Sequence, residues 1–158
     1  MVLREIDFKT SDIRDSPTLS FDLQKLILQR QYQAEIIPDG EWLISDRSAV
    51  DPVMYAKHLC GEDAVQEMLN TPEWGVLSQS MQASTVIVCQ AGTEWLKDDG
   101  VRLMPENRND WMELHNKFCD FMVEMGIPFV VLPNTMTDIE RRVEFVVDIW
   151  RQARDMRL

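Results

Sequence analysis

The sequence has few of the features that build disulfide frameworks, metal sites and membrane spans. Its three cysteines, Cys60, Cys89 and Cys119, are far apart and odd in number, so neither a disulfide framework nor a CxxC metal site is expected. No apolar run approaches the length of a membrane span, and the first ten residues lack the apolar core of a signal peptide. We therefore expect a cytoplasmic protein with no membrane span.

Positive charge is also scarce. The formal net charge is -11, because 27 Asp and Glu residues outnumber 16 Lys and Arg residues. Broad binding to nucleic acid or to an anionic membrane requires clustered Lys and Arg, so the composition argues against both partners, while a local basic pocket for one small phosphate ligand remains allowed. The length of 158 residues fits a single domain over 1–158.

Helical patterns alternate with short apolar runs that are typical of buried strands. Ser16 is placed to cap a helix that has Pro17 at its first position, and Thr137 with Glu140 fits a capping box for the last helix. This alternation predicts an α/β fold with a short, mainly parallel sheet flanked by helices. Strands are expected at 41–45, 85–89 and 128–132, and helices at 17–36, from 52 to about 59, from 62 to about 69, from about 72, from about 110 to 125, and from 137 onward.

Polar residues follow each expected strand, at the edge of a parallel sheet where ligands bind. Asp46, Arg47 and Ser48 follow the first strand, and Asn134 and Thr135 follow the third. The Asp46 carboxylate could hold magnesium or accept a proton, and the Arg47 guanidinium could bind phosphate. The alternative is an ordinary strand end whose Asp and Arg pair with each other or with solvent.

The segment 90–110 between the second strand and the next helix is long and polar and contains glycine. Its Gly100 gives backbone freedom, and Arg102 and Arg108 could reach over a phosphate, as in a lid that closes on a substrate. The alternative is an exposed acidic turn. The pair Asp51-Pro52 is better explained as a helix start than as catalytic machinery.

These residues together resemble a known family. The segments in order are "WLISDRSAVDPVMYA", "TVIVCQAGTEWLKDDGVR" and "GIPFVVLP". They are similar to AAA-type P-loop NTPases related to the ribosylnicotinamide kinases, a branch close to nucleoside and nucleotide kinases. The resemblance implies an incomplete P-loop NTPase-like three-layer fold and phosphoryl transfer that uses Mg²⁺ with ATP or GTP.

The resemblance also implies roles for individual residues. Asp46 would be the catalytic base or the magnesium ligand, and Arg47 would contact substrate or phosphate. Arg102 would be the lid arginine. Asn134 and Thr135 would lie near the adenine. Beside these, Ser48 and Arg108 are candidates for binding substrate or phosphate.

The sequence departs from the family pattern in one respect. The motif GxxxxGK[ST], whose backbone amides and Lys hold the phosphates, does not occur in residues 1–158. We therefore expect a truncated or degenerate phosphoryl-transfer domain with doubtful catalysis. The family places the P-loop strand between the strands that correspond to 41–45 and 85–89. We expect those strands to pair directly, to borrow a strand in a homo-oligomer, or to dock on a protein partner.

Two alternatives remain open beside this hypothesis. One is a regulatory module without catalysis that binds a protein or associates with itself through exposed sheet edges. The other is a fragment whose intact form carries the P-loop.

Overall fold

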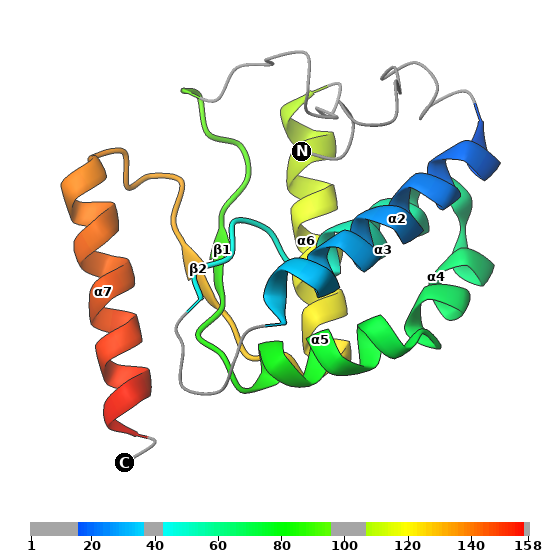
Figure 1. The fold of residues 1–158 in the computed structure, drawn as a ribbon. Helices are drawn as coiled ribbons and strands as arrows, with labels where there is room; N and C mark the ends of the chain where they lie inside the picture. Colours follow the sequence, from blue (N-terminus) through cyan, green and yellow to red (C-terminus); the bar gives the residue numbers. More distant parts are fainter. Residues whose placement is uncertain (1–15, 37–42, 96–106, 157–158) are drawn as a thin grey trace. The chain divides into compact units, whose positions relative to one another are not determined.

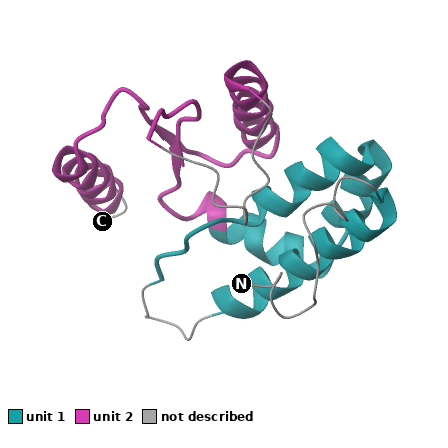
Figure 2. Cartoon of the chain, turned by 90° about the horizontal axis from the view of Figure 1, so that it is seen from above, with its two compact units in different colours: residues 1–80 teal, residues 81–158 magenta. Residues whose placement is uncertain are grey.

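The computed structural model describes residues 16–36, 43–95 and 107–156. Its contacts divide the chain into two compact units, residues 1–80 and residues 81–158, which Figure 2 colours separately. The expectation of one domain over 1–158 stays a prediction. None of the helices in the described ranges combines the length and apolar character that a membrane crossing requires.

The first unit is helical (Figure 1). Helix α2 begins at Pro17 as predicted, because the Ser16 side chain accepts a hydrogen bond from the Leu19 amide at 3.3 Å. Helix α2 packs on α3, and α3 packs on α4. The bounds of the helices are Pro17–Glu35 for α2, Val50–Cys60 for α3, Glu62–Leu69 for α4 and Pro72–Gln82 for α5, whose last two residues belong to the second unit.

The core of this unit consists of apolar side chains at helical spacing. Those with almost no exposed surface come from α2, α3, α4 and α5: Leu23, Leu28, Val50, Val53, Val65, Met68 and Leu77. Removing this much apolar surface from water is the main stabilising contribution to the unit. The core holds the C-terminal end of α2 near the N-terminal end of α3, where the predicted site residues of this unit lie.

The prediction of a buried strand at 41–45 is wrong for residues 43–45, which the structure describes. Residues 43–45 form no strand, and Ile44 is 98% exposed. A strand requires a partner for its backbone groups. Instead, two side-chain hydrogen bonds hold this segment against α2. Gln31 donates to the Ser45 hydroxyl, and that hydroxyl donates to Glu35.

The second unit contains the sheet. Strands β1 (Ile87–Cys89) and β2 (Val130–Leu132) pair in parallel, with Ile87 opposite Val130 and Cys89 opposite Leu132. The predicted parallel α/β class is therefore confirmed, although β1 pairs with β2 and the described part of 41–45 contributes no strand. Both strands are shorter than the apolar runs that predicted them.

Two helices accompany the sheet, α6 (Arg108–Glu124) and α7 (Ile139–Asp155). As predicted, α6 ends before Gly126, which has a left-handed φ of 64°. The Ile127 amide then donates to the Met122 carbonyl at 2.9 Å, as in a glycine-terminated helix end.

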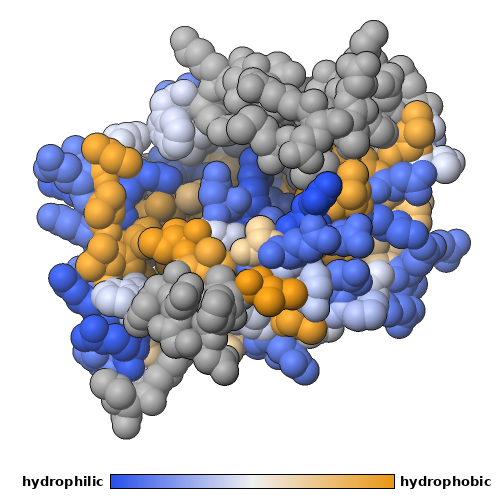
Figure 3. Space-filling model, viewed as in Figure 1, coloured by the Kyte–Doolittle hydropathy of each residue, from blue (hydrophilic) through white to orange (hydrophobic). Residues whose placement is uncertain are grey.

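Helix α7 differs from the prediction at its start. The Asp138 carboxylate, rather than Thr137, caps the helix by accepting from the Arg141 amide at 2.9 Å. The helix packs against β2, but none of its residues is fully buried. Ile139 is 69% exposed and Val143 is 54% exposed, and Figure 3 shows an apolar stripe along this helix.

Candidate functional site

The predicted residues Asp46, Arg47 and Ser48 lie in the turn that leads into α3. Ser48 donates twice to Asp51: its backbone amide and its hydroxyl bind Asp51 Oδ2 at 2.9 and 3.1 Å. The Val50 amide donates to Ser48 Oγ at 3.2 Å. The bond from the Ser48 amide to Asp51 is the carboxylate half of a capping box, and the bond from Val50 gives the Ser48 hydroxyl a part in the same cap. Asp51 thus lies in the first turn of α3, in agreement with its prediction as a helix start.

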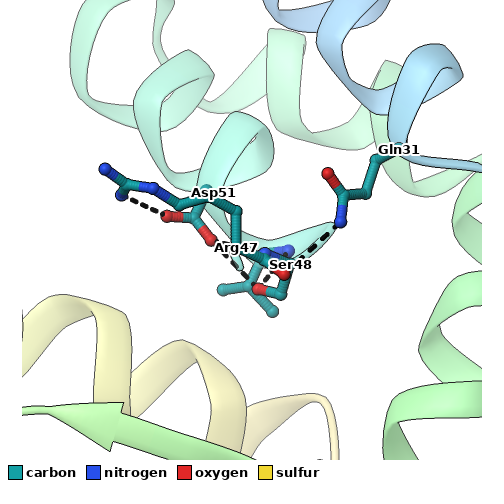
Figure 4. A network of polar contacts seen from close by, with 5 residues as sticks. Gln31, Arg47, Ser48 and Asp51 are labelled. Carbon is teal, nitrogen blue, oxygen red and sulfur yellow. Dashed lines mark hydrogen bonds and ion pairs between the residues drawn. The ribbon is translucent and has the colours of Figure 1, made fainter. Parts of the chain in front are cut away.

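Arg47 has an unusual backbone. Its φ of 103° makes it the one non-glycine residue with positive φ among those that the structure describes. Its carbonyl accepts from Gln31 Nε2 at 3.4 Å, and the same nitrogen donates to Ser45 Oγ at 2.8 Å and to Glu35. Gln31 therefore connects the end of α2 to the turn before α3 (Figure 4).

The Arg47 guanidinium pairs with Asp51. Nη1 lies 3.1 Å from Oδ1, which leaves the other carboxylate oxygen for Ser48 (Figure 4). Burial lowers the pKa of Arg47, but the charge and hydrogen bond of Asp51 outweigh it, so the pKa is raised. Burial, followed by the charge of Asp51, raises the pKa of Tyr55. At neutral pH, therefore, Arg47 is a cation and Tyr55 is neutral.

The partner of Arg47 differs from the one that the alternative of an ordinary strand end predicted. That alternative paired Arg47 with Asp46 or with solvent, whereas Asp46 is exposed and the ion pair forms with Asp51. The signal was present, since Arg47 and Asp51 have the i,i+4 spacing at which helical charges meet. Gln31 carried no comparable signal, because its contacts reach 14 and 16 residues along the chain.

In the second unit, Asn134 bridges the ends of the two strands. Its backbone amide donates to Gln90 Oε1 at 3.0 Å, and its side-chain Nδ2 donates to the Ala91 carbonyl at 2.7 Å. Gln90 in turn donates its amide to the Leu132 carbonyl at 3.0 Å. Asn134 thus fixes the segments that follow β1 and β2, a role that its residue type alone did not reveal.

Arg108 lies beside this bridge. Gly92 has φ of 77°, and a Cβ built there would be 3.3 Å from Arg108 Nε and 3.2 Å from Met112 Sδ. The same Cβ would be 3.5 Å from Asn134 Nδ2. Glycine therefore permits both the backbone conformation and the close approach of the Arg108 side chain to the carboxyl ends of the strands.

Thr135 has a different structural role from Asn134. It lines an open pocket of about 310 Å³ together with Pro133, Met136, Thr137, Asp138 and Arg141. The pocket lies at the N-terminal end of α7, and its lining includes two threonines, an aspartate and an arginine. Of the two residues predicted to bind a base, Thr135 thus lines an open pocket, while Asn134 is used in the bridge.

The predicted residues therefore fall into three groups. Asp46, Arg47 and Ser48 belong to the first unit, while Arg108, Asn134 and Thr135 belong to the second. Arg102 lies outside the described residues.

Magnesium has no complete site in the described ranges, since no three His, Cys, Asp or Glu side chains there are placed to hold a metal ion. Mg²⁺ commonly binds through one or two carboxylates plus substrate phosphates. Asp46 is exposed, and its role as a magnesium ligand stays a prediction.

Comparison with known proteins gave one family. A family model described as "AAA domain" matches residues 2–142. No curated protein and no solved structure gave a significant match. The matched range includes the α3 cap, the sheet, the Asn134 bridge and the pocket residues up to the start of α7.

Proposed function

The chain belongs to the AAA domain family, and on that premise we propose that it is a degenerate kinase-like domain that binds ATP or GTP but transfers phosphate poorly. Family membership indicates a nucleotide-binding, NTPase-like function. The finer relationship to ribosylnicotinamide kinases and to nucleoside or nucleotide kinases is part of this proposal.

The observation that carries the proposal is the arrangement at the carboxyl ends of β1 and β2. A guanidinium, that of Arg108, packs beside Gly92, and an open pocket contains Thr135. Ligands of parallel sheets bind at this edge, and guanidinium groups hold phosphate through paired hydrogen bonds. We assign phosphate contact to Arg108 and base contact to Thr135, with Asn134 positioning both segments.

Two observations, one from the sequence and one from the first unit, support the proposal of poor phosphoryl transfer. Residues 1–158 contain no GxxxxGK[ST] motif, and preorganised amide donors supply much of the stabilisation that phosphoryl transfer requires. Arg47 is already paired with Asp51. The role of Asp46 as a magnesium-side carboxylate is part of this proposal, since Mg²⁺ commonly binds through one or two carboxylates.

A thermal-shift titration tests nucleotide binding. ATP and GTP, each with and without Mg²⁺, are expected to raise the unfolding temperature, since a ligand that binds the native state stabilises it. Arg108→Gln and Thr135→Val should weaken this effect. Lys117→Gln is the matched control, because it removes an exposed positive charge on the same helix as Arg108.

Two results would contradict the proposal. If ATP, GTP and free nucleosides all leave the unfolding temperature unchanged, nucleotide binding is wrong. If the purified chain shows magnesium-dependent ATP turnover that Asp46→Ala abolishes, poor transfer is wrong. Truncation is a separate hypothesis, which an in-frame GxxxxGK[ST] in the coding DNA upstream of Met1 would support.

A second function is favoured by the exposed apolar side chains of α7. Ile139 and Val143 lie one turn apart on a helix with no fully buried residue. Such a stripe is typical of surfaces that associate with a protein or with another copy of the chain. Mass measurement by light scattering over a range of concentrations tests self-association, and Val143→Glu should reduce any assembly that forms through this stripe.

A further inference from the structure

The network around Arg47 contains a carboxylate that serves two functions with separate atoms. Asp51 Oδ1 binds the Arg47 guanidinium at 3.1 Å, whereas Oδ2 accepts from the Ser48 amide and hydroxyl. The bonds of Oδ2 complete the cap of α3 and do not depend on Arg47. The guanidinium can therefore leave Asp51 without removing the cap.

The Arg47 side chain is accessible to a ligand. It is 53% exposed, and Nη1 makes its hydrogen bond to Asp51. A guanidinium has five N–H donors, and the bond to Asp51 uses one of them, so other donors can bind an oxyanion from solvent. An oxyanion that binds the side of the guanidinium facing Asp51 must compete with that carboxylate for Nη1.

The backbone at Arg47 keeps the guanidinium at this place. A positive φ at an arginine costs free energy and persists only where the surroundings determine it. Gln31 supplies one such contact through its hydrogen bond to the Arg47 carbonyl, and the Ser48 cap supplies the next. These contacts involve the backbone, so they remain when the guanidinium changes partner.

We propose that Asp51 is an internal competitor that regulates the binding of phosphate-bearing ligands at Arg47. A phosphate oxygen displaces Asp51 Oδ1 from Nη1 while Oδ2 keeps its bonds to Ser48. The charge of Asp51 thus lowers the affinity for phosphate and favours a closed ion pair in the absence of ligand. This inference rests on the proposed function, because it assumes that the chain binds phosphate-bearing ligands, and it concerns Arg47 of the first unit.

The test uses the full chain and inorganic phosphate, with affinity measured by isothermal titration calorimetry. Asp51→Asn keeps an oxygen for the Ser48 cap and removes the competing charge. Because a partly exposed ion pair is weak, we expect phosphate to bind roughly two- to fivefold more tightly to this variant. Glu62→Gln is the matched control, since it neutralises a carboxylate in the exposed pair with Lys57 in the same unit.

Arg47→Gln identifies the group on which Asp51 acts. In that background, Asp51→Asn should give no increase in phosphate affinity. Unchanged or weaker phosphate binding by Asp51→Asn in the presence of Arg47 would overturn the proposal. So would an equal gain from Glu62→Gln, which would show a general effect of net charge.

A second measurement tests the proposal if the Asp51→Asn variant does not fold. If circular dichroism shows that Asp51→Asn is unfolded, the carboxyl ¹³C resonance of Asp51 is followed in the wild-type chain during phosphate titration. A shift that saturates with phosphate supports displacement, and an unchanged resonance overturns it. Absence of phosphate binding to the wild type and the variant also overturns this proposal. The proposed function is decided separately, by nucleotide stabilisation that depends on Arg108 and Thr135.

Discussion

The left-handed backbone at Arg47 predicts an inverted order of stability for two substitutions. Arg47→Gly and Arg47→Ala both remove the ion pair with Asp51, so their difference isolates the backbone. Alanine keeps the unfavourable φ of 103°, whereas glycine adopts it without a steric penalty.

The magnitude follows from two opposing terms. A residue other than glycine in a sparsely populated region of φ and ψ costs about 1–3 kcal/mol. Glycine loses more conformational entropy on folding, which costs about 0.5–1 kcal/mol relative to alanine. We therefore expect Arg47→Gly to be more stable than Arg47→Ala by about 1 kcal/mol, within a range of about 0–2.5 kcal/mol.

Urea unfolding at fixed pH measures this difference. Circular dichroism and tryptophan fluorescence should give coincident transitions, which permits a two-state free energy of unfolding. Ala34→Gly is the control, because Ala34 is exposed in α2 and the same exchange should destabilise by about 0.5–1 kcal/mol there. An Arg47→Gly variant that is no more stable than Arg47→Ala would refute the argument from backbone strain.

Three further predictions concern single side chains. Ser48→Ala removes the hydroxyl from the α3 cap and should lower the free energy of unfolding by about 1 kcal/mol in urea, whereas Ser48→Thr should restore most of it. Burial lowers the pKa of His115 in the folded state. As the pH falls below about 6.5, the unfolded state therefore takes up a proton before the folded state does. The contribution of this histidine to stability is fully present above that pH and is lost below it. His115→Gln should reduce the difference in stability between pH 7.5 and 5.5, as urea unfolding at the two pH values would show. Burial, then the charge of Asp120, raises the pKa of the Cys119 thiol, so iodoacetamide at neutral pH should label the exposed Cys89 first, as mass spectrometry of peptides would show. Faster labelling of Cys119 would contradict this order.

Features governed by local chemistry were predictable from the sequence. The Ser16-Pro17 pair and Gly126 gave the start of α2 and the end of α6, because helix ends depend on the nearest few residues. The capping box at Thr137 and Glu140 was placed one residue early, since Asp138 is also a good cap and makes the hydrogen bond. Such ambiguity is inherent where two capping residues are adjacent.

Features that depend on a distant partner were not predictable. The run 41–45 has the composition of a buried strand, but its described part pairs with no strand and Ile44 is exposed. The bridge from Asn134 to Gln90 and Ala91 joins positions far apart in the sequence. The positive φ of Arg47 likewise reflects its surroundings, because arginine has no intrinsic preference for it.

The bridge at Asn134 also bears on how the second unit folds. Its hydrogen bond to Gln90 joins residues 44 positions apart, and all of α6 lies between them. Closing a chain segment of this length costs entropy before any strand contact forms, so parallel pairing of such short strands is a late event. Helix α6, whose backbone hydrogen bonds are local, can form first and shorten the distance that β1 and β2 must bridge. Formation of the sheet edge at Asn134 would then coincide with the last step of folding of this unit.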